Sequence, residues 1–95
     1  MNYPMTPWGI PDNAINYAEG IVFYETSSHG GFHLSDGRIS ELPANLRTPD
    51  HFYEEDCEAA VVFMQFPEIC QGIEHREKAT ETFNMYYPDG FKPWR

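Results

Sequence analysis

The stretch "IVFYETSSHGGFHLSDGRISEL", residues 21–42, decides the fold. It contains three short runs rich in β-branched, aromatic and aliphatic residues, and a Ser/His/Gly turn separates the first two runs. The dipeptide Asp36-Gly37 separates the second run from the third. Asp-Gly between short extended runs predicts a type I′ hairpin turn, because both central positions need a positive φ. The sequence therefore predicts a three-stranded antiparallel sheet over about residues 20–42.

The second half of the chain predicts two helices. Thr48 or Asp50 is placed to cap the first one. Its apolar residues follow the i, i+4, i+7 spacing of one helical face: Tyr53, Cys57, Ala60, Val61 and Met64. We expect this helix over about residues 51–66, with its C-terminal half buried, and a second helix over about 73–87.

Composition and chain length predict one folded domain, residues 1–95, of the α+β class. The chain is 41% hydrophobic and 16% aromatic, which is enough for a single core but not for two. Both predicted helices are expected to pack on one face of the sheet. Prolines and aromatic residues in the first 13 residues and in the tail "FKPWR" predict extended arms laid over the domain, with Trp8 as an anchor.

Charge restricts the classes of partner. Fifteen Asp and Glu against six Lys and Arg give a net charge of −9, which repels nucleic-acid backbones and attracts basic surfaces. No apolar run is long enough for a membrane helix. The N-terminal sequence lacks a basic segment followed by an apolar one. We therefore expect a monomeric cytoplasmic protein that binds neither a membrane nor nucleic acid directly.

The stretch "DHFYEEDCE", residues 50–58, carries five carboxylates and no Lys or Arg. At the start of a helix, the backbone dipoles stabilise one or two negative charges, so a solvated helix face is one interpretation. The surplus favours the other interpretation, a contact surface for a basic partner. The predicted partner-binding residues are Asp50, Phe52, Tyr53, Glu54, Glu55, Asp56 and Glu58, with the two aromatic side chains as apolar anchors.

Other combinations of residues favour chemistry less strongly. Cys57 as a nucleophile near a helix start, with His29 or His51 as its base, would resemble a thiol enzyme, although the neighbouring carboxylates argue against activation of the thiol. The histidines and cysteines match no metal-site spacing, so we predict no metal and no cofactor. Gly30 and Gly31 are expected at positive-φ positions of a turn. We also expect the two cysteines to be free.

Four sequence blocks resemble a domain of unknown function that recurs in proteins of bacterial plasmids, prophages and phages. They are "TPWG", "ETSSHGGFHLS", "ELPANLR" and "FYEEDCEAAVVFMQFPE", within residues 6–68. The resemblance carries no activity that transfers to this chain. It implies a mobile-element product that works in a bacterial cytoplasm. It also implies that the shared His-Gly-Gly and Glu-Asp-Cys motifs are a candidate family site, which keeps the enzyme hypothesis open.

Charge and resemblance together predict an inhibitor that imitates the charge density of DNA. The leading hypothesis is an anti-CRISPR protein whose carboxylates occupy the DNA-binding or PAM-reading surface of a Cas complex. A small Cys/His-dependent enzyme is the alternative from a different class. An antitoxin or immunity protein that neutralises a basic toxin would present the same acidic surface to a different partner.

Overall fold

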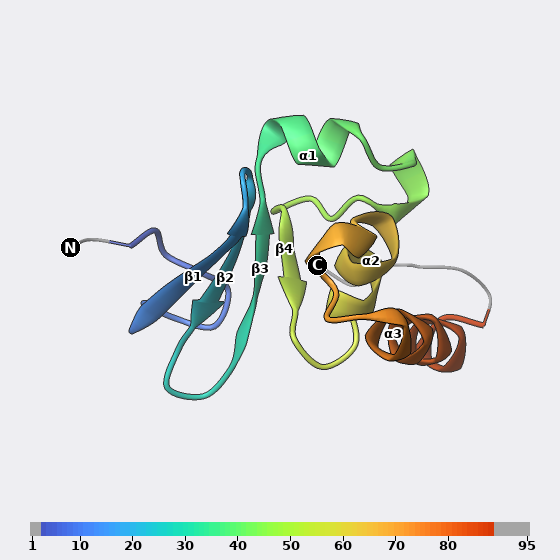
Figure 1. Ribbon diagram of the computed structural model, residues 1–95. Coiled ribbons are helices and arrows are strands. Elements are labelled where there is room, and N and C mark those ends of the chain that lie inside the picture. The colour runs from blue at the N-terminus through green and yellow to red at the C-terminus, as the bar shows by residue number, and fades with distance from the viewer. Residues whose placement is uncertain (1–2, 89–95) are drawn as a thin grey trace.

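The computed structural model describes residues 3–88 as an antiparallel sheet with helices after and between its strands (Figure 1). This confirms the α+β class, with four strands in place of the expected three. In chain order the elements are β1 (Asn13–Ala18), β2 (Ile21–Glu25), β3 (Gly30–Leu34), α1 (Asp36–Ser40), β4 (Phe52–Glu54), α2 (Ala59–Gln65) and α3 (Ile73–Tyr86). Two 3-10 helices, Ala44–Leu46 and Pro67–Ile69, precede β4 and follow α2.

The four strands lie in sequence order, and each is antiparallel to the next. A two-residue turn joins β1 to β2, with Gly20 at φ +81°, a conformation that an L side chain rarely adopts. The tight hairpin of this protein is therefore at Glu19-Gly20. Residues 14–18, which the sequence patterns left unassigned, form most of the edge strand β1.

The prediction of a third strand in the run Arg38–Leu42, after Asp36-Gly37, is wrong. Asp36-Gly37 begins helix α1, whose N-cap Ser35 accepts a hydrogen bond from the Arg38 backbone nitrogen at 3.2 Å. The Arg38 guanidinium lies 5.0 Å from the centre of the Phe66 ring, and its Nε donates to the Glu19 carbonyl. These long-range contacts hold α1 across the end of the sheet.

The predicted helix over 51–66 is also wrong in its first half. Residues 52–54 form β4, residues 55–58 form a turn, and only Ala59–Gln65 is helical. In β4, Tyr53 pairs with Phe32 of β3. The Asp50 carboxylate accepts a hydrogen bond from the Phe52 backbone nitrogen, a local turn that replaces the predicted helix cap. Pairing with β3 satisfies backbone groups that a helix would have satisfied locally.

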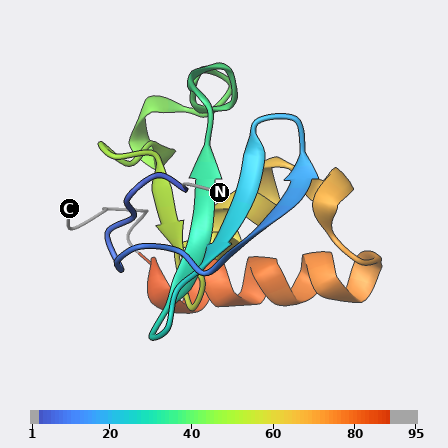
Figure 2. The same cartoon turned by 90° about the vertical axis from the view of Figure 1, so that its left-hand side faces the viewer.

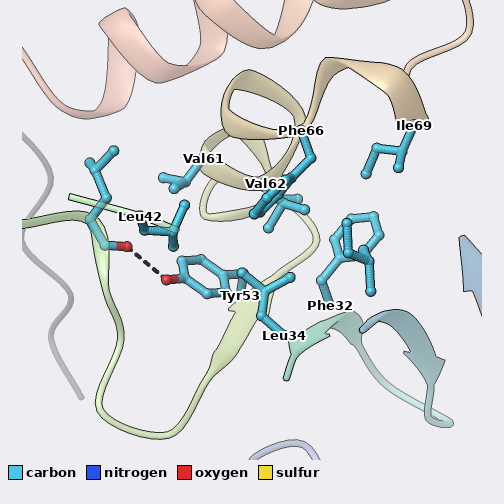
Figure 3. Close-up of a cluster of buried hydrophobic side chains, with 11 residues drawn as sticks. Phe32, Leu34, Leu42, Tyr53, Val61, Val62, Phe66 and Ile69 are labelled. Atoms are coloured by element: carbon cyan, nitrogen blue, oxygen red, sulfur yellow. Dashed lines mark hydrogen bonds between the residues drawn. The ribbon is translucent and has the colours of Figure 1, made fainter. Parts of the chain in front are cut away.

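The core lies between the sheet and α2 (Figure 3). Its fully buried members come from three strands and the helix: Ile21, Phe32, Leu34, Tyr53, Val61 and Val62. The Tyr53 hydroxyl donates to the Leu46 carbonyl at 2.7 Å and accepts from the Thr48 nitrogen at 3.1 Å. This phenol therefore ties the loop before β4 to the strand itself.

Helices α2 and α3 lie on the same side of the sheet, as predicted, and α3 packs on α2 (Figure 2). The structure places α3 at Ile73–Tyr86, within one residue of the expected 73–87. The predicted C-terminal arm, residues 91–95, lies outside the described residues.

The N-terminal arm covers the opposite face of the sheet (Figure 2). Trp8 packs edge-on against Phe52, with ring centres 5.7 Å apart, so the expected anchoring role of Trp8 is confirmed. A side chain at Gly31 would collide with the Trp8 indole and with the Tyr53 carbonyl. Gly30 and Gly31 lie in extended strand β3 rather than at positive φ. Glycine is required at position 31 because the Trp8 ring and the Tyr53 carbonyl lie close to it, and not because of turn geometry.

Candidate functional site at the acidic end of the sheet

The acidic run 50–58 does not form one cluster. Asp50 precedes β4, where its carboxylate bonds to the Phe52 nitrogen. Glu55 and Asp56 follow β4 and are exposed at the other end of that strand. Glu58 is only 2% exposed. The strand therefore separates carboxylates that one helix face would have brought together.

The two predicted aromatic anchors are also inside the fold. Tyr53 is 0% exposed, and its hydroxyl bonds to backbone groups. Phe52 is buried on the other face between Trp8 and His33. Neither side chain has surface to offer a partner in this conformation, because consecutive strand residues enter the two covered faces of the sheet.

A different set of carboxylates meets at one end of the sheet. Glu25 ends β2 opposite Gly30, whose carbonyl accepts the Glu55 backbone nitrogen at 3.0 Å. Glu25 and Glu55 line one hollow beside the β2–β3 turn. We call the following four residues the acidic end: Glu25, Glu54, Glu55 and Asp56. Glu25 was missed from the sequence, since only the strand register brings it to Glu55.

The carboxylates of the acidic end have no partner of opposite charge among residues 3–88. Elsewhere the acidic side chains are partly compensated. Arg38 lies 3.7 Å from both Glu41 and Glu68, and His51 lies 3.6 Å from Asp36. Other described carboxylates, such as Glu74, Glu77 and Glu81 of α3, also have no ion pair. The acidic end differs from them because the strand register gathers its carboxylates at one end of the sheet.

Two of the motifs that carry the resemblance support this end of the sheet. Trp8 of "TPWG" rests on Gly31 of "SSHGG". Gly31 pairs across the strands with Glu54, and Gly30 accepts the hydrogen bond that begins the turn at Glu55. The N-terminal arm, the glycine pair and the acidic run form one connected structure.

Glu58 stabilises the turn from within. Its Oε1 accepts a hydrogen bond from the Glu54 backbone nitrogen at 3.0 Å. A buried carboxylate that accepts a backbone N–H holds the 54–58 turn closed. Glu58 therefore shapes the acidic end and does not itself face solvent.

Cys57 lies beside Tyr87 near the end of α3. Burial, then a hydrogen bond with Cys57, and then the Glu58 and Glu54 carboxylates raise the pKa of Tyr87 above its ordinary value. The phenol therefore stays protonated, and Tyr87 packs against the core. Cys57 is a free thiol.

His29 lies on the exposed β2–β3 turn, where its backbone bonds to Thr26. No contact of the described residues joins His29 to Cys57. The pair of the alternative enzyme hypothesis, His29 and Cys57, is therefore not in contact in this structure. Cys57 faces a phenol instead.

A second polar group lies at the other end of β4. His33 and His51 have ring centres 6.0 Å apart, and His33 packs against Phe52. Burial, followed by the neighbouring His51, lowers the pKa of His33, while Asp36 and Asp50 oppose that shift. Asp50 therefore belongs electrostatically to this histidine pair and not to the acidic end.

Two features are absent from the described part of the chain. Within residues 3–88, no three His, Cys, Asp or Glu side chains are arranged to hold a metal ion. No helix there has the length and apolar character needed to cross a membrane.

The chain matches the model of a protein family. The model of the domain of unknown function DUF7007 matches residues 2–95. The chain belongs to this family. The expected membership of a domain of unknown function is thus confirmed, and the match extends beyond residues 6–68 to include α3 of this DUF7007 domain. No curated protein and no solved structure matches the chain.

Proposed function

We propose that this protein is a stoichiometric inhibitor that binds a basic, nucleic-acid-binding surface of another protein through its acidic end. The observation that carries the proposal is the group of four uncompensated carboxylates at one end of the sheet. A site built for phosphates accepts carboxylates when they are dense and fixed in place. The strand register and the Glu58 bond supply that fixed arrangement.

The proposed target is a Cas effector complex of a bacterial host, with the acidic end in place of DNA at the DNA-binding or PAM-reading surface. The sequence resemblance to proteins of mobile elements motivates this choice, because such elements encounter host defence complexes. A net charge of −9 adds long-range attraction to a basic groove.

The test is competition between this protein and labelled target DNA for purified Cas effector complexes. The wild-type protein should displace the DNA, and rising salt should weaken its binding. A variant with Glu25→Gln, Glu54→Gln, Glu55→Gln and Asp56→Asn should bind roughly 30-fold more weakly, since four exposed pairs at about 0.5 kcal/mol each are lost.

The matched control changes the same number of charges elsewhere. It carries Glu19→Gln, Glu74→Gln, Glu77→Gln and Glu81→Gln, all at exposed positions that are not part of the acidic end. This control should keep most of the affinity. Equal losses in both variants would show that net charge alone acts, and unchanged binding of the first variant would refute the proposal.

The same experiment addresses the other functions. Cys57→Ser with His29→Ala should leave DNA displacement intact, whereas its loss would favour the Cys/His enzyme. Failure to bind any Cas complex, together with charge-dependent neutralisation of a basic toxin, would favour an antitoxin or immunity protein.

A further inference from the structure

A groove of about 120 Å³ lies between α2 and α3, next to the acidic end. Its base consists of small buried residues, Ala59 and Ala60 of α2 and Ala79 of α3. The Phe63 ring forms part of the wall. Alanines at these positions leave space between the helices, so a groove with a partly apolar lining remains.

The side chain of His75 is held in place at the edge of this groove. Its Nδ1 accepts a hydrogen bond from the Gln71 backbone nitrogen at 3.0 Å, and its ring lies 4.4 Å from that of Phe63. The His75 ring therefore forms part of the wall of the groove.

Charge at the rim is unequal. Glu55 and Asp56 line the groove with two carboxylates, and Lys78 contributes one ammonium. Among the described residues, Lys78 forms no ion pair with either carboxylate. The rim is net negative, and the carboxylates that meet this groove are exposed and belong to the proposed binding surface.

We propose that this groove receives an arginine side chain of the bound partner, with the guanidinium directed at Glu55 and Asp56. This inference rests on the proposed function and names the chemistry of its partner. A guanidinium is flat, stacks on apolar and aromatic surfaces, and bonds to carboxylates through two parallel N–H groups. Its size is suitable, since a cavity of about 150 Å³ holds a benzene-sized ligand.

Arginine is favoured over lysine by the aromatic and apolar side chains in the lining of the groove. An ammonium is a strongly hydrated point charge that gains little from such surfaces. Basic surfaces that hold nucleic acid present arginine to phosphates, so such a side chain is available on the proposed target.

The experiment is an NMR titration of the protein with N-acetylarginine amide, followed at the methyl groups of Ala59, Ala60 and Ala79. Saturable shifts confined to these methyls and their neighbours are expected. N-acetylcitrulline amide, which has nearly the same shape and no charge, should produce none. Nα-acetyllysine amide, which keeps its side-chain ammonium, should bind more weakly than the arginine probe.

Variants assign the effect to the groove. Glu55→Gln with Asp56→Asn should weaken binding of the arginine probe about fivefold, and Lys78→Gln should strengthen it about twofold. Thr82→Leu adds bulk at the groove lining without a change of charge and should also weaken binding. Glu74→Gln, at an exposed position on α3, is the control and should have no effect.

Equal binding of citrulline, unsaturable shifts spread over all acidic residues, or indifference to Thr82→Leu and Lys78→Gln would each overturn the inference. These outcomes are separable from failure of the proposed function. If the arginine probe misses the groove while DNA displacement still depends on the acidic end, only the inference fails. If the probe binds the groove but displacement ignores the acidic end, only the proposed function fails.

Discussion

Strand β4 and the turn that follows it are adjacent in sequence but have opposite surroundings. Residues 52–54 are paired with β3 and are largely buried, whereas Glu55 and Asp56 are exposed. The strand is covered by α2 on one face and by Trp8 on the other. Stability should therefore be concentrated in β4 and its contacts, and charge-led binding in the turn.

Carboxylates that are neighbours in sequence therefore do not share one environment. Glu58 belongs to the same run as Glu55, yet it is buried and bonds to the backbone. Glu58 differs from Glu55 because its carboxylate is the hydrogen-bond acceptor for the Glu54 backbone nitrogen. Four predictions test this division, in decreasing order of their effect on the free energy of unfolding.

The largest effect is expected for Gly31→Ala. The new Cβ would collide with the Trp8 indole and with the Tyr53 backbone carbonyl, which cannot both move without opening the sheet. The free energy of unfolding should fall by about 3 kcal/mol, measured by urea denaturation. Gly37→Ala is the control, because its Cβ would have no contact closer than 3.8 Å to Ser35. It should leave stability unchanged or raise it by up to about 1 kcal/mol.

Tyr53→Phe should have the next largest effect. It removes the hydroxyl that bonds to Leu46 and Thr48 and leaves both backbone groups buried without that partner. A loss of about 2 kcal/mol is expected by thermal and urea unfolding. Tyr17→Phe, at an exposed position of β1, should change stability little. Equal effects of the two substitutions would contradict the assignment of β4 as the stabilising region.

Glu58→Ala should cost about 1 kcal/mol, because the Glu54 nitrogen loses its acceptor. Glu58→Gln retains an oxygen acceptor and should lose less. Urea denaturation measures both, and hydrogen exchange at the Glu54 amide reports on the bond directly. A loss from Glu58→Gln as large as that from Glu58→Ala would show that the charge matters more than the bond.

The smallest effect on stability is expected for the double variant Glu55→Gln with Asp56→Asn. Both side chains are exposed and have no ion pair among residues 3–88, so unfolding should change by less than about 0.5 kcal/mol. Its affinity for the partner, measured by DNA displacement, should nevertheless fall. A destabilised double variant with normal partner binding would reverse the comparison.

Local sequence patterns predicted the elements whose contacts are local. Helix α3 follows its own helical spacing and begins at the expected residue, Ile73. Strands β2 and β3 lie within the expected sheet, joined by the predicted Ser/His/Gly turn. The patterns misplaced β4, because Tyr53 and Cys57 fit a helical spacing while pairing with β3 gave the backbone a non-local alternative.

The turn predicted at Asp36-Gly37, where helix α1 begins instead, shows the same limit of local sequence patterns. Ile39 and Leu42 have the i, i+3 spacing of a helix face, and both pack against the core. Ser35 at the N-cap and Arg38 on Phe66 complete the stabilisation of α1. The predicted hairpin rested on the dipeptide alone. The contact between Arg38 and the distant Phe66 ring could not be predicted from local sequence.

The sequence by itself determined the fold class, helix α3, the order of the central strands and the excess of negative charge, since these follow from composition and short-range spacing. Only the tertiary structure decided which carboxylates face solvent together. Glu25 joins Glu55 through the register of three strands, while Glu58 and Tyr53 are drawn inside by backbone groups that need partners. The physical reason is that burial and hydrogen-bond satisfaction are set by residues far apart in the chain.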